Sequence, residues 1–270
     1  MTQARPYTNT SESTPVAHPV VKPVQATGAG GKALPEPYKS TGNEALDTLA
    51  FLHLLEQLKV EKRSGWIREG LQLTASIADH MCRMALMAMM IPSTAERPLD
   101  IPRCVMMALV HDLAEAYVGD ITPIEGVPAH VKHQLEEQAM DSFLNEMLGG
   151  EGNRQARERF RSLWEEYEAR ETPESKLVKD LDRLELVLQA VEYERCELGV
   201  WPHSMGAHPL PSPGHPHVRK WAESAMEERK QLWAERGRAE EEAAQLGGVK
   251  VGSKVDAKLN GHANGNGDHA

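Results

Sequence analysis

An ionisable pair inside an apolar segment is the feature that most constrains the fold of this chain. His111 and Asp112 stand in the run Ala-Leu-Val-His-Asp-Leu-Ala-Glu, and the stretch from Ile101 to Tyr117 is rich in Met, Ala, Leu and Val. A proline at its second position and a glycine just beyond its end predict a single helix. Burying an imidazole and a carboxylate on such a helix costs free energy unless a partner or a metal ion satisfies them.

Two interpretations of this pair are open at this point. A hydrogen-bonded core pair or an N-cap explains a lone His-Asp dipeptide more simply than a metal site does. Glu115 follows Asp112 by three residues and His111 by four, so a helix brings its carboxylate to the same face. Asp120 adds another acid just after the segment. The segment therefore predicts either a buried ionic pair or one part of a metal centre.

The composition favours helices and argues against two classes of partner. Apolar residues make up 40% of the 270 residues but aromatic ones only 5%, and the abundant Met, Ala, Leu and Glu are helix formers. We therefore expect an all-α fold. The net charge of -10 repels phosphate, which argues against binding to a nucleic-acid polymer or to a membrane surface. An anionic substrate must then be met by local cations or by a metal ion.

The two ends of the chain differ from its middle. Residues 1–42 mix Thr, Ser, Pro, Gly and Val without a period, and residues 247–270 are rich in Gly, Asn and Lys. Both ends are predicted to be disordered tails, because such segments bury too little apolar surface to offset chain entropy. Residues 43–246 are expected to form a single compact multi-helix domain.

The sequence also indicates where the protein works. No apolar run approaches the about 20 residues of a membrane span. Neither a secretory signal nor a mitochondrial presequence is recognisable at the N-terminus. The three cysteines show no CxxC spacing and are expected to be buried thiols in a reducing compartment. We therefore expect a cytoplasmic or nuclear protein.

Helical periodicity divides the middle region. The first helix is predicted from Asn43 to about Val60, with its many leucines forming the apolar face. Further helices are expected at about 77–91, 131–148, 157–171, 174–198 and 218–244. Residues 199–217 contain five prolines and four histidines at irregular spacing and are expected to be a loop rather than a metal site.

A tryptophan beside arginines marks the interruption at residues 63–70. Trp66 lies between Arg63 and Arg68 in a stretch expected to be a loop. Loops placed by a rigid scaffold often carry function, so Trp66 is a candidate wall of a substrate site. A tryptophan that only caps the core explains the pattern equally well.

Two more candidate ligands stand on other predicted helices. His80 lies one turn into the helix at 77–91, where a hydrogen-bonded core histidine is the simpler interpretation. Asp182 lies beside the apolar stripe of the helix at 174–198, close to Lys179. A structural salt bridge explains Asp182 as well as metal ligation does, if that residue is considered alone.

Together these residues form a pattern of one histidine, a His-Asp pair and a later aspartate. The pattern resembles the HD-domain superfamily of metal-dependent phosphohydrolases, and more closely the eukaryotic HD-domain-containing 5'-deoxynucleotidase family. The resemblance covers about residues 43–235. It rests on Arg-Ser-Gly-Trp at 63–66, Ile-Ala-Asp-His-Met at 77–81, Ala-Leu-Val-His-Asp-Leu-Ala-Glu at 108–115, Val-Gly-Asp-Ile at 118–121 and Lys-Asp-Leu-Asp at 179–182.

The resemblance implies a set of site residues. The implied ligands of a divalent ion, Mn²⁺, Co²⁺ or Mg²⁺, are His80, His111, Asp112 and Asp182. Mixed imidazole and carboxylate ligation suits Mn²⁺ or Co²⁺ better than Mg²⁺. The acids implied beside that ion are Glu115 and Asp120, either as ligands of a second ion or as handlers of the water and leaving group.

The same resemblance implies substrate contacts from Arg63 and Trp66. In bacterial relatives an arginine directly precedes the tryptophan, whereas Gly65 does so here and Arg63 lies two residues earlier. The expected reaction is hydrolysis of 2'-deoxynucleoside 5'-monophosphates, namely dAMP, dCMP, dGMP and dTMP, by a homodimer. The alternatives are a nucleotide phosphodiesterase or triphosphohydrolase of HD type, or a non-catalytic helical scaffold that keeps a relic metal site.

Overall fold

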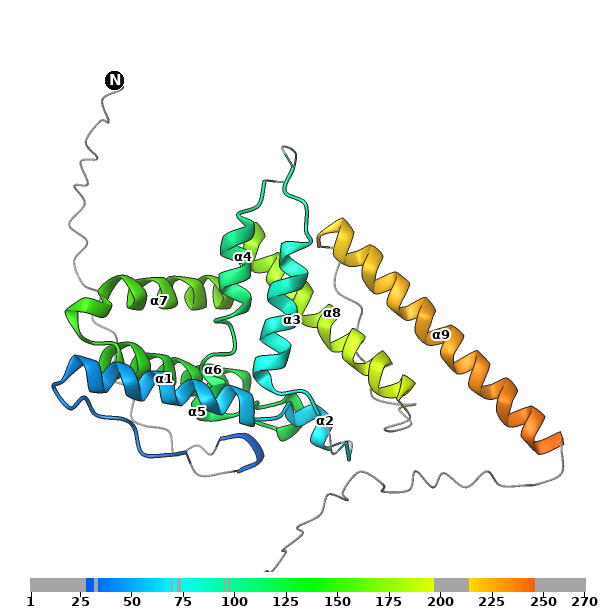
Figure 1. Ribbon diagram of the computed structural model, residues 1–270, viewed down its shortest axis with the longest axis horizontal. Coiled ribbons are helices and arrows are strands. Elements are labelled where there is room, and N and C mark those ends of the chain that lie inside the picture. The colour runs from blue at the N-terminus through cyan, green and yellow to red at the C-terminus, as the bar shows by residue number, and fades with distance from the viewer. Residues whose placement is uncertain are drawn as a thin grey trace, which may run out of the picture. The chain divides into compact units, whose positions relative to one another are not determined.

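The computed structural model describes residues 28–31, 34–68, 70–71, 74–94, 96, 98–196 and 214–245. The tail predicted at 247–270, the first 27 residues and most of the loop predicted at 199–217 lie outside these described residues. Across the described ranges the elements are helical and no strand is present, which confirms the expected all-α fold (Figure 1). None of the described helices combines the length and apolar character of a membrane span.

The longer helices follow the predicted ranges closely, except at the His-Asp segment. The longer elements are α1 (Glu44–Val60), α3 (Ile77–Met89), α4 (Ile101–Ala108), α6 (Ala129–Ser142), α7 (Arg154–Ala169), α8 (Pro173–Arg195) and α9 (Pro216–Gln245). The short ones are α2 (Ser64–Arg68), α5 (Glu115–Val118), the π-helical η3 (Phe143–Met147) and the 3-10 turns η1 (Ala29–Gly31), η2 (Pro123–Glu125) and η4 (Glu151–Asn153). The stretch expected to be a loop at 63–70 thus contains the helical turn α2.

Contacts group the chain into two compact units that interleave along the sequence. Unit 1 comprises Met1–Trp66, Ala75–Ile77 and Asp112–Arg161, and unit 2 comprises Ile67–Thr74, Ala78–His111 and Ser162–Ala270. The range expected to form one domain, 43–246, runs through both units. The peptide bond between His111 and Asp112 is one of the points where the chain passes from one unit to the other.

The core of unit 1 is built on aromatic rings. The ring centroid of Phe51 on α1 lies 6.4 Å from that of Phe143 and 5.6 Å from that of Phe160, both in edge-on geometry. Edge-on pairs of this kind stabilise a core beyond their buried area. α1 therefore buries the face that carries Phe51 and Leu58.

The leucine face predicted for α1 is confirmed at Leu58, which is buried, and is wrong for the leucines of the first half of the helix. Leu46, Leu49 and Leu52 are 53%, 47% and 56% exposed. Leucines occur all around this helix, so their spacing alone does not select a buried face. The tertiary contacts of the aromatic ring decide the orientation instead.

Asp47 ties part of the N-terminal segment to α1. Its buried carboxylate accepts hydrogen bonds from the hydroxyl groups of Tyr38, Ser40 and Thr41 at 2.7, 2.6 and 2.8 Å, and from the backbone N–H of Thr41 at 2.8 Å. Tyr117 in turn donates to the carbonyl oxygen of Pro35. The segment between residues 34 and 43, which composition assigns to a tail, is therefore attached to unit 1.

The core of unit 2 lies between α3, α4 and α8. The fully buried side chains there include Met84, Met107, Leu181 and Leu184. The periodicity of α3 and α8 predicts the burial of those on these two helices. The helices α8 and α9 run side by side (Figure 1), and α4 packs on α8 as well. The long helix α8 thus provides a rigid support for the side chains on its flanks.

Candidate active site

The His-Asp motif lies in a turn rather than in one continuous helix. α4 ends at Ala108, residues 109–114 form turns, and α5 begins at Glu115. The backbone N–H of Glu115 donates to the carbonyl oxygen of Asp112 at 3.0 Å, a three-residue step instead of the four-residue step of an α-helix. The prediction of one helix over 101–117 is therefore wrong, because the backbone tightens at the motif.

Unit 2 brings together His80, His111 and Asp182. The two imidazole rings are 1% and 4% exposed, and their centroids are 5.5 Å apart. Nε2 of His80 lies 3.3 Å from Oδ1 of Asp182. The Nδ1 atom of His111 lies 2.9 Å from the carbonyl oxygen of Ala108. Side chains from α3, α8 and the turn after α4 thus lie close together in this unit, and their role as metal ligands stays a prediction.

Asp182 is held in its charged form. Lys179, one turn earlier on α8, donates to its Oδ2 at 2.6 Å, and the hydroxyl of Tyr167 donates to the same atom at 3.2 Å. Burial alone raises the pKa of Asp182, but the hydrogen bond to His80 and the charge of Lys179 outweigh it and hold the pKa well below 3.8. The salt bridge that the sequence suggested between Asp182 and Lys179 is therefore present. Asp182 also lies near His80 and His111.

Unit 1 brings together Asp112, Glu115 and Asp120. Glu115 is 3% exposed, and its Oε2 atom makes no hydrogen bond to any described residue. Its Oε1 atom lies 3.4 Å from Nζ of Lys132, which also donates to the carbonyl oxygen of Ile121 at 3.1 Å. Burial, and then the charges of Asp112 and Asp120, raise the pKa of Glu115 well above 4.5.

One of the predicted substrate residues, Arg63, lies close to these acids in the same unit. Nη1 of Arg63 donates to Oδ2 of Asp112 at 3.3 Å, and the backbone N–H of Ser64 donates to Oδ2 of Asp120 at 2.7 Å. The side chain of Trp66, on α2, is 5% exposed, which agrees with the core-capping alternative. A direct contact of Trp66 with substrate stays a prediction.

Sequence reasoning missed Lys132 and Glu185. Lys132 lies on α6, and in the sequence the charged residues of that helix indicate a solvent-exposed face. The ion pair between Lys132 and Glu136, four residues later, is a common pattern on exposed helix surfaces. Glu185 stands one turn after Asp182 on α8 and is 3% exposed. In the sequence, the only indication that Glu185 is buried is its position next to the apolar stripe of α8.

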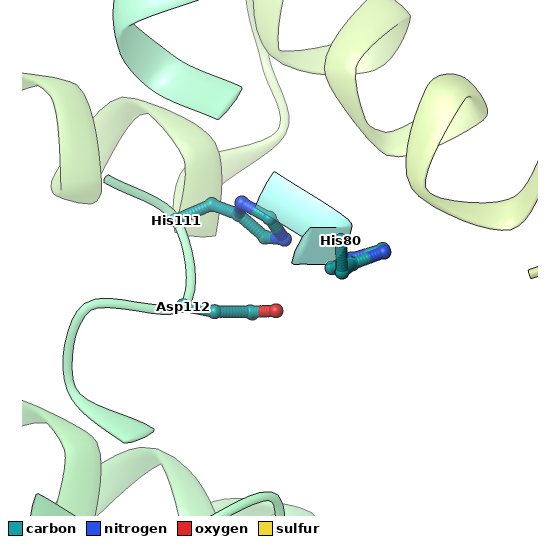
Figure 2. A group of neighbouring side chains, drawn as sticks. All are labelled: His80, His111 and Asp112. Atoms are coloured by element: carbon teal, nitrogen blue, oxygen red, sulfur yellow. The ribbon is translucent and has the colours of Figure 1, made fainter. Parts of the chain in front are cut away.

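The donor set fits a divalent metal ion. His80, His111 and Asp112 each offer one ligand atom, and these atoms all lie within 4.8 Å of one another (Figure 2). Two imidazole nitrogens with a carboxylate oxygen are the ligands that borderline transition metals favour. Burial of both rings also excludes competing water from the nitrogen atoms.

Comparisons with known proteins point to the same chemistry. The family model described as HD domain matches residues 55–201. The 5'-deoxynucleotidase hdd1 of Schizosaccharomyces pombe is 38% identical over 71% of this chain and 94% of the relative. The 5'-deoxynucleotidase HDDC2 of Homo sapiens is 44% identical over 58% of this chain and 73% of the relative.

A solved structure agrees with these sequence relatives. The HD domain-containing protein YGK1 matches with a TM-score of 0.50 and 27% identity, over 72% of this chain and 90% of that protein. The family model spans more than half of the chain, and the matched relatives are covered over most of their length. The chain belongs to the HD domain family of metal-dependent phosphohydrolases, within its group of 5'-deoxynucleotidases.

Proposed function

We propose that the protein hydrolyses 2'-deoxynucleoside 5'-monophosphates, with dAMP, dCMP, dGMP and dTMP as substrates, to the deoxynucleoside and inorganic phosphate. The observation that carries the proposal is the donor set of His80, His111 and Asp112, in a chain whose matched relatives are named 5'-deoxynucleotidases. Hydrolysis of a phosphomonoester needs charge neutralisation at phosphorus and a positioned water, and this set suits both needs.

The proposed ligands of the ion are His80, His111, Asp112 and Asp182. We propose Mn²⁺ or Co²⁺ over Mg²⁺, because imidazole ligands suit the former pair better. A bound ion would withdraw charge from the phosphoryl oxygens and lower the pKa of a water molecule. Metal titrations of the metal-free protein, followed by phosphate release, test which ion restores turnover.

Glu115 and Asp120 are the proposed catalytic acids. Glu115 holds a proton more readily than an ordinary carboxyl group, so it is suited to proton transfer at its Oε2 atom. The backbone N–H of Ser64 orients Asp120. The alternative role of these two acids is to bind a second metal ion. The number of metal ions bound per chain in the active protein distinguishes this role from proton transfer.

Arg63 and Trp66 are the proposed substrate contacts. An indole packed against the sugar leaves a 2'-hydroxyl without room or without a hydrogen-bond partner, which costs about 1–3 kcal/mol. We therefore expect kcat/KM for dAMP to exceed that for AMP by roughly ten- to a hundred-fold, with similar values among the four deoxynucleotides. Trp66→Ala should reduce the ratio of kcat/KM for dAMP to kcat/KM for AMP.

A nucleotide panel decides between this reaction and its alternatives. Phosphate release should be measured for the four deoxynucleotides, AMP, a cyclic nucleotide and a nucleoside triphosphate. Equal rates for dAMP and AMP would contradict the proposed specificity. Activity confined to the cyclic nucleotide or the triphosphate would favour another HD-type hydrolase, and no activity with any metal would favour the scaffold.

We also propose that the protein is a homodimer. The exposed side chains of Leu46, Leu49 and Leu52 on α1 provide apolar surface that a second copy would cover. Light scattering should give twice the chain mass, and the paired change of Leu49→Glu and Leu52→Glu should give a monomer. A monomeric native protein at micromolar concentration would contradict the proposal.

A cytoplasmic or nuclear location completes the proposal. Cys104 is buried, but the prediction of burial is wrong for Cys82 and Cys196, which are exposed because Cys82 lies outside the packed face of α3 and Cys196 lies at the C-terminal end of α8. All three are free thiols, as a reducing compartment would maintain them. Microscopy of a fluorescent fusion in living cells tests this location, and a signal confined to a secretory compartment would contradict it.

A further inference from the structure

Glu185 is a buried carboxylate of unit 2 that the proposed reaction does not use. It lies on α8, one turn after Asp182, and is 3% exposed. Its two oxygen atoms have different partners: Oε2 lies 2.6 Å from Nδ1 of His80, and Oε1 accepts a hydrogen bond from Nε of Arg83 at 2.9 Å. A carboxylate so deeply buried needs such partners to remain charged.

Arg83 links this carboxylate to the surface of the unit. It lies on α3, one turn after His80, and each of its three guanidinium nitrogen atoms donates a hydrogen bond to a side chain of α8. Nη1 donates to Glu192 at 2.7 Å and Nη2 donates to Gln189 at 2.9 Å, in addition to the bond from Nε to Glu185. The planar guanidinium thus fixes the orientation of the Glu185 carboxylate.

The two candidate histidine ligands share one arrangement. Each uses Nδ1 for a contact within the protein, His80 with a carboxylate and His111 with the carbonyl oxygen of Ala108. A partner at Nδ1 fixes the ring orientation and leaves Nε2 to face the site, where His80 meets Asp182. The carboxylate partner differs from the carbonyl in that it also increases the electron-donating strength of the ring.

We propose that Glu185, held by Arg83, is a positioning residue that presents Nε2 of His80 to the metal ion. The inference rests on the proposed function, because it assigns a role toward the proposed metal site. Outer partners of metal-bound histidines typically contribute 10- to 100-fold in metal affinity. Glu185 would therefore set how tightly the ion is held, without touching the substrate.

The test compares two carboxylates that contact the same arginine. Glu185→Gln removes the charge beside His80, whereas Glu192→Gln removes the partner of Arg83 that is 47% exposed and does not contact His80. We expect the Mn²⁺ dissociation constant, measured by calorimetry on the metal-free protein, to rise 10- to 100-fold in Glu185→Gln and to stay within about 2-fold in Glu192→Gln.

Two further readouts separate positioning from mere loss of structure. The ¹⁵N chemical shifts of the His80 ring in the metal-free protein should change in Glu185→Gln and not in Glu192→Gln. Turnover of dAMP by Glu185→Gln should recover toward the wild-type value when Mn²⁺ saturates the site. Arg83→Met, at a partly exposed position, keeps Glu185 but removes the hydrogen bonds that orient its carboxylate, so this change should also weaken Mn²⁺ binding.

The outcomes distinguish this inference from the proposed function. Wild-type Mn²⁺ affinity together with unchanged His80 shifts in Glu185→Gln would overturn the positioning role alone. A wild-type protein that binds no Mn²⁺, Co²⁺ or Mg²⁺ would overturn the proposed function and this inference with it. Weaker binding in both glutamine variants to the same extent would assign the effect to overall charge and would also overturn the positioning role.

Discussion

Glu115 in unit 1 is a buried carboxyl group, Asp182 in unit 2 is a half-buried one with 16% of its side chain exposed, and their pKa values move in opposite directions. The pKa of Asp182 falls below 3.8, because a histidine and a lysine contact its oxygen atoms. The pKa of Glu115 rises above 4.5, because burial and two neighbouring carboxylates outweigh the nearby Lys132. The two environments therefore favour opposite forms of the same functional group, the charged form of Asp182 and the protonated form of Glu115.

The difference teaches that burial alone does not assign a role to an acid. A carboxylate that stays charged suits a metal ligand, since ligands must be deprotonated. A carboxyl group with a raised pKa suits proton transfer near neutral pH. On this basis we propose Asp182 as a ligand of the metal ion and Glu115 as a proton-transfer group, and the predictions below challenge that division in order of expected effect.

The largest effect is expected for Asp182→Asn. The change removes the ligand charge while keeping the side-chain size, so bound metal and activity on dAMP should both fall to background. The rise in melting temperature on adding Mn²⁺ should also disappear, because a ligand that binds only the folded state stabilises it. Asp141→Asn, at an exposed ion pair with Arg161, is the matched control. Full metal content by elemental analysis in Asp182→Asn would refute its role as a ligand.

Glu115→Gln should lose rate but keep metal. The amide preserves size and hydrogen bonding while removing the titrating proton, so kcat should fall by about 10² or more. Elemental analysis should show wild-type metal content in the same sample. Glu136→Gln, which removes another acid beside Lys132, should leave kcat unchanged. A near-wild-type rate in Glu115→Gln would make Glu115 a structural acid.

Lys132→Met should shift the pH dependence of turnover. The positive charge of Lys132 lowers the pKa of Glu115, so its removal should raise that pKa further. The limb of the kcat profile governed by Glu115 should therefore move to higher pH. The profile should be recorded at saturating dAMP and Mn²⁺ from pH 5 to 9. An unchanged profile would mean that another group controls this limb.

The smallest effect on turnover is expected for a change at Asp47, which belongs neither to the proposed metal ligands nor to the proposed proton-transfer acids. Its pKa is held well below 3.8, chiefly by the Ser40 hydroxyl and then by the backbone N–H of Thr41. A depressed folded-state pKa gives stability that is present above the unfolded pKa and is lost as pH falls through the folded value. Asp47→Asn should therefore lower the melting temperature at pH 7 and flatten its decline below about pH 4, with kcat unchanged.

Truncations extend this prediction to the N-terminal segment. Removal of residues 1–27 should leave stability unchanged, whereas removal of residues 1–43 should lower the melting temperature, because the partners of Asp47 are lost. Equal melting temperatures for the two truncations would show that the attachment contributes nothing to stability.

The elements and the ligand types could be predicted from the sequence because both depend on local patterns. The helix boundaries at Asn43 and Pro173 follow from a side-chain cap and from a proline in the first turn. The orientation of α1 could not be predicted, since leucines surround the helix and the contacts of Phe51 decide its buried face. The turn at the His-Asp motif was also missed, because two leucines and an alanine among residues 109–114 are good helix formers and neither Gly nor Pro interrupts this stretch.

The candidate site was predictable in its ligand types and less so in its supporting residues. Considered alone, His80 and Asp182 each had a structural interpretation, and the resemblance to the HD-domain family singled them out together with the motif after α4. Lys132 and Glu185 resemble ordinary charges of a helix surface in the sequence, and only the packing of neighbouring helices reveals that they contact the candidate site. Their roles depend on tertiary contacts that no local pattern encodes.

The most direct test of the opposed roles is a carboxyl ¹³C NMR titration of the metal-free protein. Glu115 and Asp182 would be assigned through the Glu115→Gln and Asp182→Asn variants, and the chemical shifts followed from pH 2 to 8. We expect Glu115 to titrate above 4.5 and Asp182 to remain ionised below 3.8. Titration of both groups at their ordinary values, or in the reverse order, would contradict the division between a metal ligand and a proton-transfer group.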